Sequence, residues 1–187
     1  LAIFNCGSEI YGLNTDKSDS DYTVIVDGFN GATVIKEDNI DYFVYGIEGF
    51  KRCCSFDENI PQYFSIWFDN VELLKDHIVA IDETRKEEIL SLLHIDWNKY
   101  FKVWLKANVD YFGIHVEFGH TEKCLYSLYR LNSITKNYHK TNKFKSFYSD
   151  EDRTYALDFK LNEKDRLLHY ERLKEIFNYL KSLVKED

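Results

Sequence analysis

Two carboxylates, Asp19 and Asp21, stand two residues apart where the chain enters the apolar run 22–26. Side chains two residues apart in a strand project from the same face, so both carboxylates are expected to point at one spot. Paired carboxylate oxygens are hard ligands, which favour Mg²⁺ or Mn²⁺ as the bound metal. The spacing of Asp19 and Asp21 therefore predicts a divalent-metal site at the start of a strand.

A Gly-Ser pair, Gly7-Ser8, follows the short apolar run 1–4 and precedes the two acids. A turn at Gly7 presents backbone N–H groups with no side chain to block an approaching group, and Ser8 adds a hydroxyl. Such a turn is suited to holding the phosphates of a nucleoside triphosphate (NTP) beside the metal. The turn and the acids together predict the chemistry of metal-dependent nucleotide transfer.

The wider pattern around these residues resembles the nucleotidyltransferase superfamily named after DNA polymerase beta, whose hallmark is Gly-Ser followed by Asp-x-Asp at the head of a strand. Within that superfamily it is similar to the branch of predicted nucleotidyltransferases associated with RNA-repair systems. The similarity is carried by Gly7-Ser8-x-x-Tyr11-Gly12-Leu13-x-Thr15-x-x-Ser18-Asp19-x-Asp21. Glu9 stands where the branch usually has Arg.

Residues 40–45 look like the strand of that branch that carries a third carboxylate. The resemblance implies that Asp41 binds metal and accepts the proton of the attacking hydroxyl. An unpaired carboxylate is costly to bury in a strand unless a cation neutralises it, which favours the same role. The alternative is that Asp41 lies on an exposed strand face and that Glu37 or Asp38 is the ligand.

Two later segments extend the resemblance. Residues 59–61, Asn-Ile-Pro, fall where the branch has an Asn-Pro pair, and Lys123, Tyr126 and Arg130 look like its C-terminal helix. Their spacing of three and four residues places these three side chains on one helix face. The resemblance implies that this face brings two cations and a phenol toward the nucleotide. The alternative is a surface face with ordinary ion pairs.

Composition limits the class of protein. The 187 residues suffice for one domain, or for a catalytic half and a helical half. The net charge of −8 repels nucleic acid as a whole, which argues against a general polyanion-coating protein but leaves a local basic patch open. The four cysteines lack zinc-site spacing and are expected to be reduced. No apolar run approaches the roughly 20 residues of a membrane span, and no signal-peptide pattern is present, so a soluble cytoplasmic protein is predicted.

Strands are predicted at 1–4, 22–26 and 40–45, with a short one at 33–35, because β-branched and aromatic residues there are bounded by Gly, Asn and Asp. From Gly49 onward, apolar spacings of three and four predict helices only. The helical positions are Val71, Leu74 and Ile78, then Ile89, Leu92 and Leu93, and the segments 97–105, 125–131 and 167–184. Strands followed by helices indicate an α+β fold, with a small strand-built nucleotidyltransferase palm (1–68) and a helical C-terminal region packed on it (69–187).

The predicted function is metal-dependent transfer of a nucleoside monophosphate from an NTP such as ATP to an acceptor, with release of pyrophosphate. Three classes of acceptor compete: an RNA 3′ end, a protein side chain and a small molecule. The resemblance favours the RNA 3′ end, whereas the net charge favours a protein. The alternatives are a protein-modifying transferase of toxin–antitoxin type and a catalytically silent nucleotide-binding module.

The segment 136–147 bears on the acceptor, because its lysines interleave with aromatic residues. The lysines are Lys136, Lys140, Lys143 and Lys145. This mixture suits contact with an RNA backbone and base stacking. The favoured interpretation is a solvated loop whose aromatic side chains pack inward.

Overall fold

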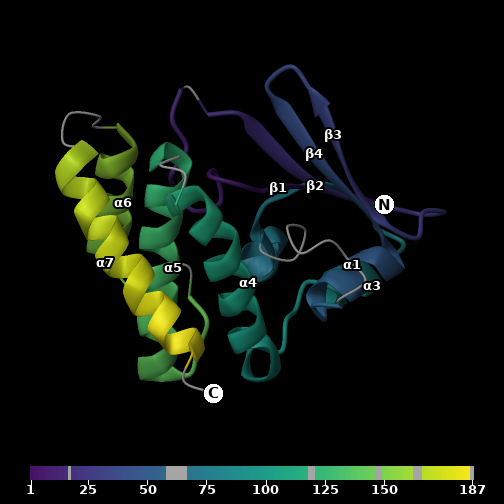
Figure 1. Ribbon diagram of the computed structural model, residues 1–187. Coiled ribbons are helices and arrows are strands. Elements are labelled where there is room, and N and C mark those ends of the chain that lie inside the picture. Colours follow the sequence, from purple (N-terminus) through teal and green to yellow (C-terminus); the bar gives the residue numbers. More distant parts are fainter. Residues whose placement is uncertain (17, 58–66, 118–120, 146–148, 162–165, 186–187) are drawn as a thin grey trace. The chain divides into compact units, whose positions relative to one another are not determined.

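The computed structural model describes residues 1–187 apart from 17, 58–66, 118–120, 146–148, 162–165 and 186–187 (Figure 1). The chain forms two compact units, Leu1–Asp96 and Trp97–Asp187. A five-stranded sheet is the basis of the first unit, and helices make up the described part of the second, so the class is α+β. The division comes later than residue 68 because the last strand of the sheet belongs to the first unit.

The sheet has the strand order β3-β4-β2-β1-β5. The strands are β1 (Ala2–Asn5), β2 (Ser20–Val26), β3 (Ala32–Glu37), β4 (Ile40–Gly46) and β5 (Ile78–Ile81). The central neighbours β2 and β4 are parallel, and the other neighbouring pairs are antiparallel. The first four strands confirm the segments predicted from β-branched and aromatic residues.

The fifth strand corrects the prediction that only helices follow Gly49. Val71 and Leu74 lie in the 3₁₀ helix η1 (Trp67–Asp76), but Ile78, predicted to continue the same helix, begins β5. The run Ile-Val-Ala-Ile is rich in β-branched residues, and it pairs with β1 at the edge of the sheet. A short apolar spacing of three and four therefore indicated the wrong structure, because pairing with a distant strand decided it.

Helices cover one face of the sheet in the first unit. Helix α1 (Ile47–Cys54) packs on β2 and β4, and η1 packs on β1. Phe4 and Ile25 are completely buried there, and the ring of Tyr45 meets that of Phe50 edge to face at 5.5 Å. A further short helix, α3 (Lys86–Ser91), contributes the buried Ile89.

The second unit contains α4 (Trp97–Glu117), α5 (Thr121–Thr141), α6 (Asp150–Leu161) and α7 (Arg166–Lys185). Helix α5 packs against α4, α6 and α7. The core of the second unit includes the fully buried side chains Trp104, Leu128, Ile134 and Leu173. Helix α6 escapes prediction from apolar spacing because Ala156 is the buried residue among its described side chains.

Candidate metal and phosphate site

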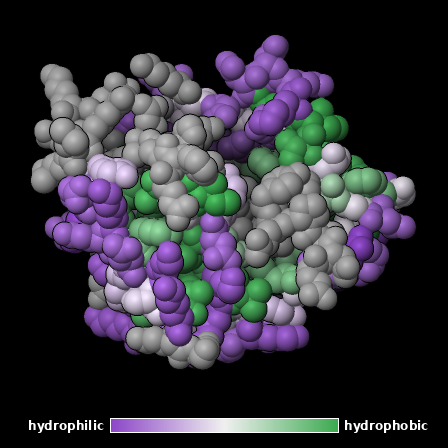
Figure 2. Space-filling view, viewed as in Figure 1, coloured by the Kyte–Doolittle hydropathy of each residue, from purple (hydrophilic) through white to green (hydrophobic). Residues whose placement is uncertain are grey.

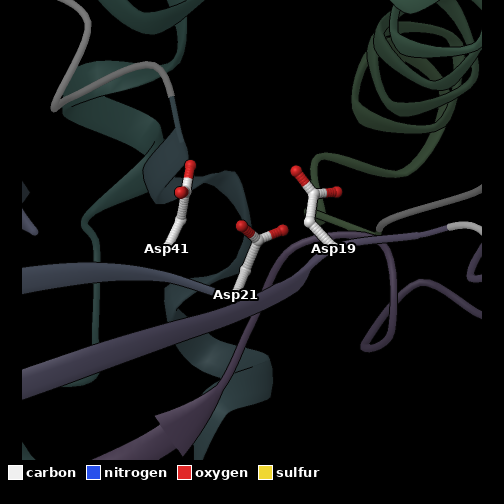
Figure 3. A group of neighbouring side chains, drawn as sticks. All are labelled: Asp19, Asp21 and Asp41. Carbon is white, nitrogen blue, oxygen red and sulfur yellow. The ribbon is translucent and has the colours of Figure 1, made fainter. Parts of the chain in front are cut away.

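Three carboxylates meet at one end of the sheet in the first unit. Asp21 in β2 is the register neighbour of Asp41 in β4, and Asp19 lies one residue before β2 begins. One carboxylate oxygen from each lies within 4.8 Å of the others, and Figure 3 shows the three groups pointing to the same side of the strands. Asp19 is exposed, and Asp21 and Asp41 are half-buried. The structure therefore brings together the three acids named from the sequence.

Strand register explains why Asp41 joins this cluster. In the parallel pair β2–β4, Ser20 is opposite Ile40, so the next residues along both strands are the two acids. Glu37 and Asp38 do not belong to the cluster. Asp38 lies in the turn between β3 and β4 with a φ of 49°, and its side chain is exposed. The geometry thus favours Asp41 over both alternative ligands.

The Gly7 backbone lies directly against Asp21. Gly7 has a φ of +64°, and a Cβ atom built on it would stand 1.9 Å from Oδ2 of Asp21. The chain is held there by the backbone N–H of Cys6, which donates to the carbonyl of Asp21 at 2.9 Å. Both the left-handed backbone and the close approach require glycine at this position. The turn and the acids therefore form one continuous surface.

Ser8 follows in the same turn, where its carbonyl accepts a hydrogen bond from the backbone N–H of Leu13 at 2.9 Å. Its side chain is half-buried. Glu9, the departure from the branch, is exposed and accepts a hydrogen bond from the side-chain amide of Asn5 at 3.2 Å. The Glu9 carboxylate therefore has a hydrogen-bond partner at the end of β1. Phosphate binding by Ser8 stays a prediction.

Lys36 is the site residue that sequence reasoning missed. Its ammonium donates to Oδ2 of Asp41, and the two residues are opposite each other in the antiparallel pair β3–β4. The hydrogen bond to Asp41 raises the pKa of Lys36, and the negative charges of Asp41, Asp19 and Asp21 raise it further. A signal existed, because a two-residue turn at Asp38-Asn39 between two strands places residue 36 opposite residue 41.

The carboxylate cluster is compatible with a divalent cation. Two oxygens on opposite sides of one Mg²⁺ lie about 4.2 Å apart, because each metal–oxygen bond is about 2.1 Å long. The three carboxylate oxygens, one from each acid, all lie within 4.8 Å of one another, which is close to this oxygen–oxygen distance. The hard oxygen donors match Mg²⁺ or Mn²⁺, and the absence of a side chain at Gly7 lets the Asp21 carboxylate lie directly against the turn.

Tyr126 and Arg130 belong to α5 in the helical unit. Arg130 is only 6% exposed, so a surface position with an ordinary ion pair does not describe it. Tyr126 is half-buried, and the ammonium of Lys160 lies 5.3 Å from the centroid of its ring. Lys123 is in the same helix, but its side chain lies outside the described residues, as do residues 59–61. Contact of this face with a nucleotide stays a prediction.

The segment 136–147 is partly helical, which corrects the prediction of a loop. α5 continues to Thr141, and the lysines named from the sequence are exposed. The Tyr138 ring stacks on Phe101 with centroids 3.8 Å apart, and Phe144 stacks on Trp97 at 4.0 Å. These two aromatic side chains do pack inward, as predicted. Phe147 lies outside the described residues.

No protein-family model, no curated protein and no solved structure matches the chain. Within the described part of the chain, none of the helices combines the length and the apolar character needed to cross a membrane.

Proposed function

We propose that this chain is a metal-dependent nucleotidyltransferase of the DNA polymerase beta type, which transfers a nucleoside monophosphate from an NTP to an acceptor hydroxyl. The observation that carries the proposal is the meeting of Asp19, Asp21 and Asp41 beside the bare backbone of Gly7. Neither feature alone is specific. Their combination supports a site that can hold a metal and a phosphate chain side by side.

The reaction assigns a role to each group. Asp19, Asp21 and Asp41 hold the metal, and the turn at Gly7 and Ser8 donates hydrogen bonds to phosphate oxygens. Mg²⁺, when bound, would stabilise the negative charge on the entering and leaving oxygens. The acceptor oxygen forms a bond to the α-phosphorus, its proton passes to Asp41, and the bond to the bridging oxygen breaks. Pyrophosphate leaves with that electron pair.

For the acceptor, we favour an RNA 3′ end. Exposed lysines on and after the end of α5 offer contacts to a phosphate backbone. Tyr138 and Phe144 already stack on rings of the helical unit, so they are not available to stack on RNA bases. The proposal of an RNA acceptor therefore depends on the lysines. A protein acceptor is the competing outcome, which the net charge of −8 favours.

The test of the metal site is calorimetric titration of the protein with each NTP, once with Mg²⁺ and once with a chelator. We expect binding to depend on the metal, because triphosphate oxygens complete its coordination shell. Asp21→Asn should weaken this dependence. Equal affinity with Mg²⁺ and with chelator would remove the proposed site.

The test of transfer uses labelled NTP with total cellular RNA or protein as acceptor. Asp41→Asn should abolish labelling while NTP binding persists, because proton transfer from the acceptor is needed only in the transition state. Asp38→Asn is the matched control, since Asp38 is a nearby exposed acid in a turn whose positive φ asparagine tolerates. Loss of labelling in the Asp38 variant, with activity kept in the Asp41 variant, would contradict the assignment.

A further inference from the structure

A cation of the chain itself lies against the carboxylate cluster. The Lys36 ammonium bonds to Asp41, whose side chain is 18% exposed, while the Lys36 side chain is 70% exposed. Hydrophilic residues cover the end of the β3–β4 hairpin that carries this pair (Figure 2). The backbone of Lys36 is therefore fixed in β3, while its solvent-exposed side chain extends to Asp41.

This placement has opposite consequences for a metal and for a phosphate chain. A divalent cation that binds Asp41 shares this carboxylate with the ammonium, and the two cations repel each other. A triphosphate beside the metal is negatively charged and attracts the same ammonium. Because the Lys36 stem is exposed and flexible, the ammonium can leave Asp41 and remain near the site.

We propose that Lys36 couples metal binding to nucleotide binding, by opposing the metal at Asp41 when it arrives alone and by contacting the phosphates when metal and triphosphate arrive together. This inference rests on the proposed function of the cluster. In the metal-free protein, Lys36 is the counter-ion that neutralises part of the charge of the three acids. On binding of the metal–triphosphate complex, it exchanges one anionic partner for another.

The experiment compares the metal alone with the metal–phosphate complex, without requiring turnover. Wild-type protein and Lys36→Met are titrated calorimetrically with Mn²⁺, and separately with preformed Mn²⁺–tripolyphosphate, which carries the phosphate chain of any NTP. An exposed ion pair is weak, so gaining or losing one changes an affinity by up to about fivefold. We expect Lys36→Met to bind Mn²⁺ about three- to fivefold more tightly and the complex about three- to fivefold more weakly.

Two further variants serve as controls. Lys36→Arg keeps the charge and should retain the wild-type preference for the complex. Lys51→Met removes an exposed lysine of the same unit, which pairs with Glu48 at 2.7 Å on α1, and should leave both affinities unchanged. Thermal unfolding checks that each variant is folded.

The outcomes separate the two proposals. Wild-type protein that binds neither Mn²⁺ nor the complex would remove the proposed metal site itself. Wild-type protein that binds both, with Lys36→Met equal to it for either probe, would overturn only the role of Lys36. Opposite shifts for the two probes in Lys36→Met, absent from the Lys51 variant, support the coupling.

Discussion

Replacing Gly7 with alanine tests whether the turn and the carboxylates work as one site. The new methyl group would stand 1.9 Å from Oδ2, 2.7 Å from Cγ and 2.8 Å from Cβ of Asp21. Contacts this short cannot persist, so either Asp21 rotates away from Asp19 and Asp41 or the backbone at Gly7 moves. Both responses disturb the cluster, and we therefore expect Gly7→Ala to weaken metal binding as well as stability.

The magnitude follows from comparison with a matched glycine. Gly28 has a φ of +70°, close to the +64° of Gly7, but nothing lies within 4 Å of the position its Cβ would occupy. Both alanines therefore meet the left-handed backbone cost of about 1–2 kcal/mol, and both gain about 0.4–1 kcal/mol from a less flexible unfolded chain. These contributions cancel in the comparison. The overlap with Asp21 remains, and overpacking of this kind typically costs about 1–3 kcal/mol.

Urea unfolding and Mn²⁺ calorimetry on both variants provide the assay. We expect the free energy of unfolding to be about 1–3 kcal/mol lower for Gly7→Ala than for Gly28→Ala. Mn²⁺ affinity should fall about 10–100-fold in Gly7→Ala, as for other groups that orient a metal ligand, and should stay at the wild-type value in Gly28→Ala.

The reasoning is refuted if the two glycine variants agree in both measurements. A second check uses the Asp21→Ala background, in which the two shortest contacts are absent and only the 2.8 Å contact to Cβ remains. The stability cost of Gly7→Ala should then be smaller than in the wild-type background. An undiminished cost would place the conflict elsewhere in the turn.

Two other predictions concern the thiols and the acceptor. Burial raises the pKa of both Cys6 and Cys53 to about 12, so these thiols ionise at lower pH in the unfolded chain than in the folded protein. The free energy of unfolding should therefore fall from pH 9 to 11, by up to about 1.4 kcal/mol per pH unit for each thiol. A free energy of unfolding in urea that is unchanged between these pH values would contradict this. If RNA is the acceptor, replacing Lys140, Lys143 and Lys145 together with Glu should remove RNA binding but spare NTP binding, and wild-type RNA affinity should fall steeply with salt. Absence of RNA binding at low salt would turn the proposal to a protein acceptor.

The sequence by itself was sufficient for the local features of the site. Asp19 and Asp21 are two residues apart, so a strand beginning between them brings their carboxylates together without help from distant residues. Gly7 was recognisable as a turn residue from the Gly-Ser pair that follows a short apolar run, but its close contact with Asp21, which requires glycine, became visible only in the fold. The first four strands were also predictable, since each is a short run with strong strand preference.

Tertiary structure decided the partners that come from elsewhere in the chain. Asp41 joins the cluster because β4 pairs in parallel with β2 in one particular register, and a shift by one residue would turn it to the other face. Lys36 reaches Asp41 only through the β3–β4 hairpin. Likewise, Ile78 enters a strand because β1 offers an unpaired edge. Residue spacing indicates which side chains of one helix or strand lie on the same face. Strand register and edge pairing depend instead on hydrogen bonds between segments that are distant in sequence.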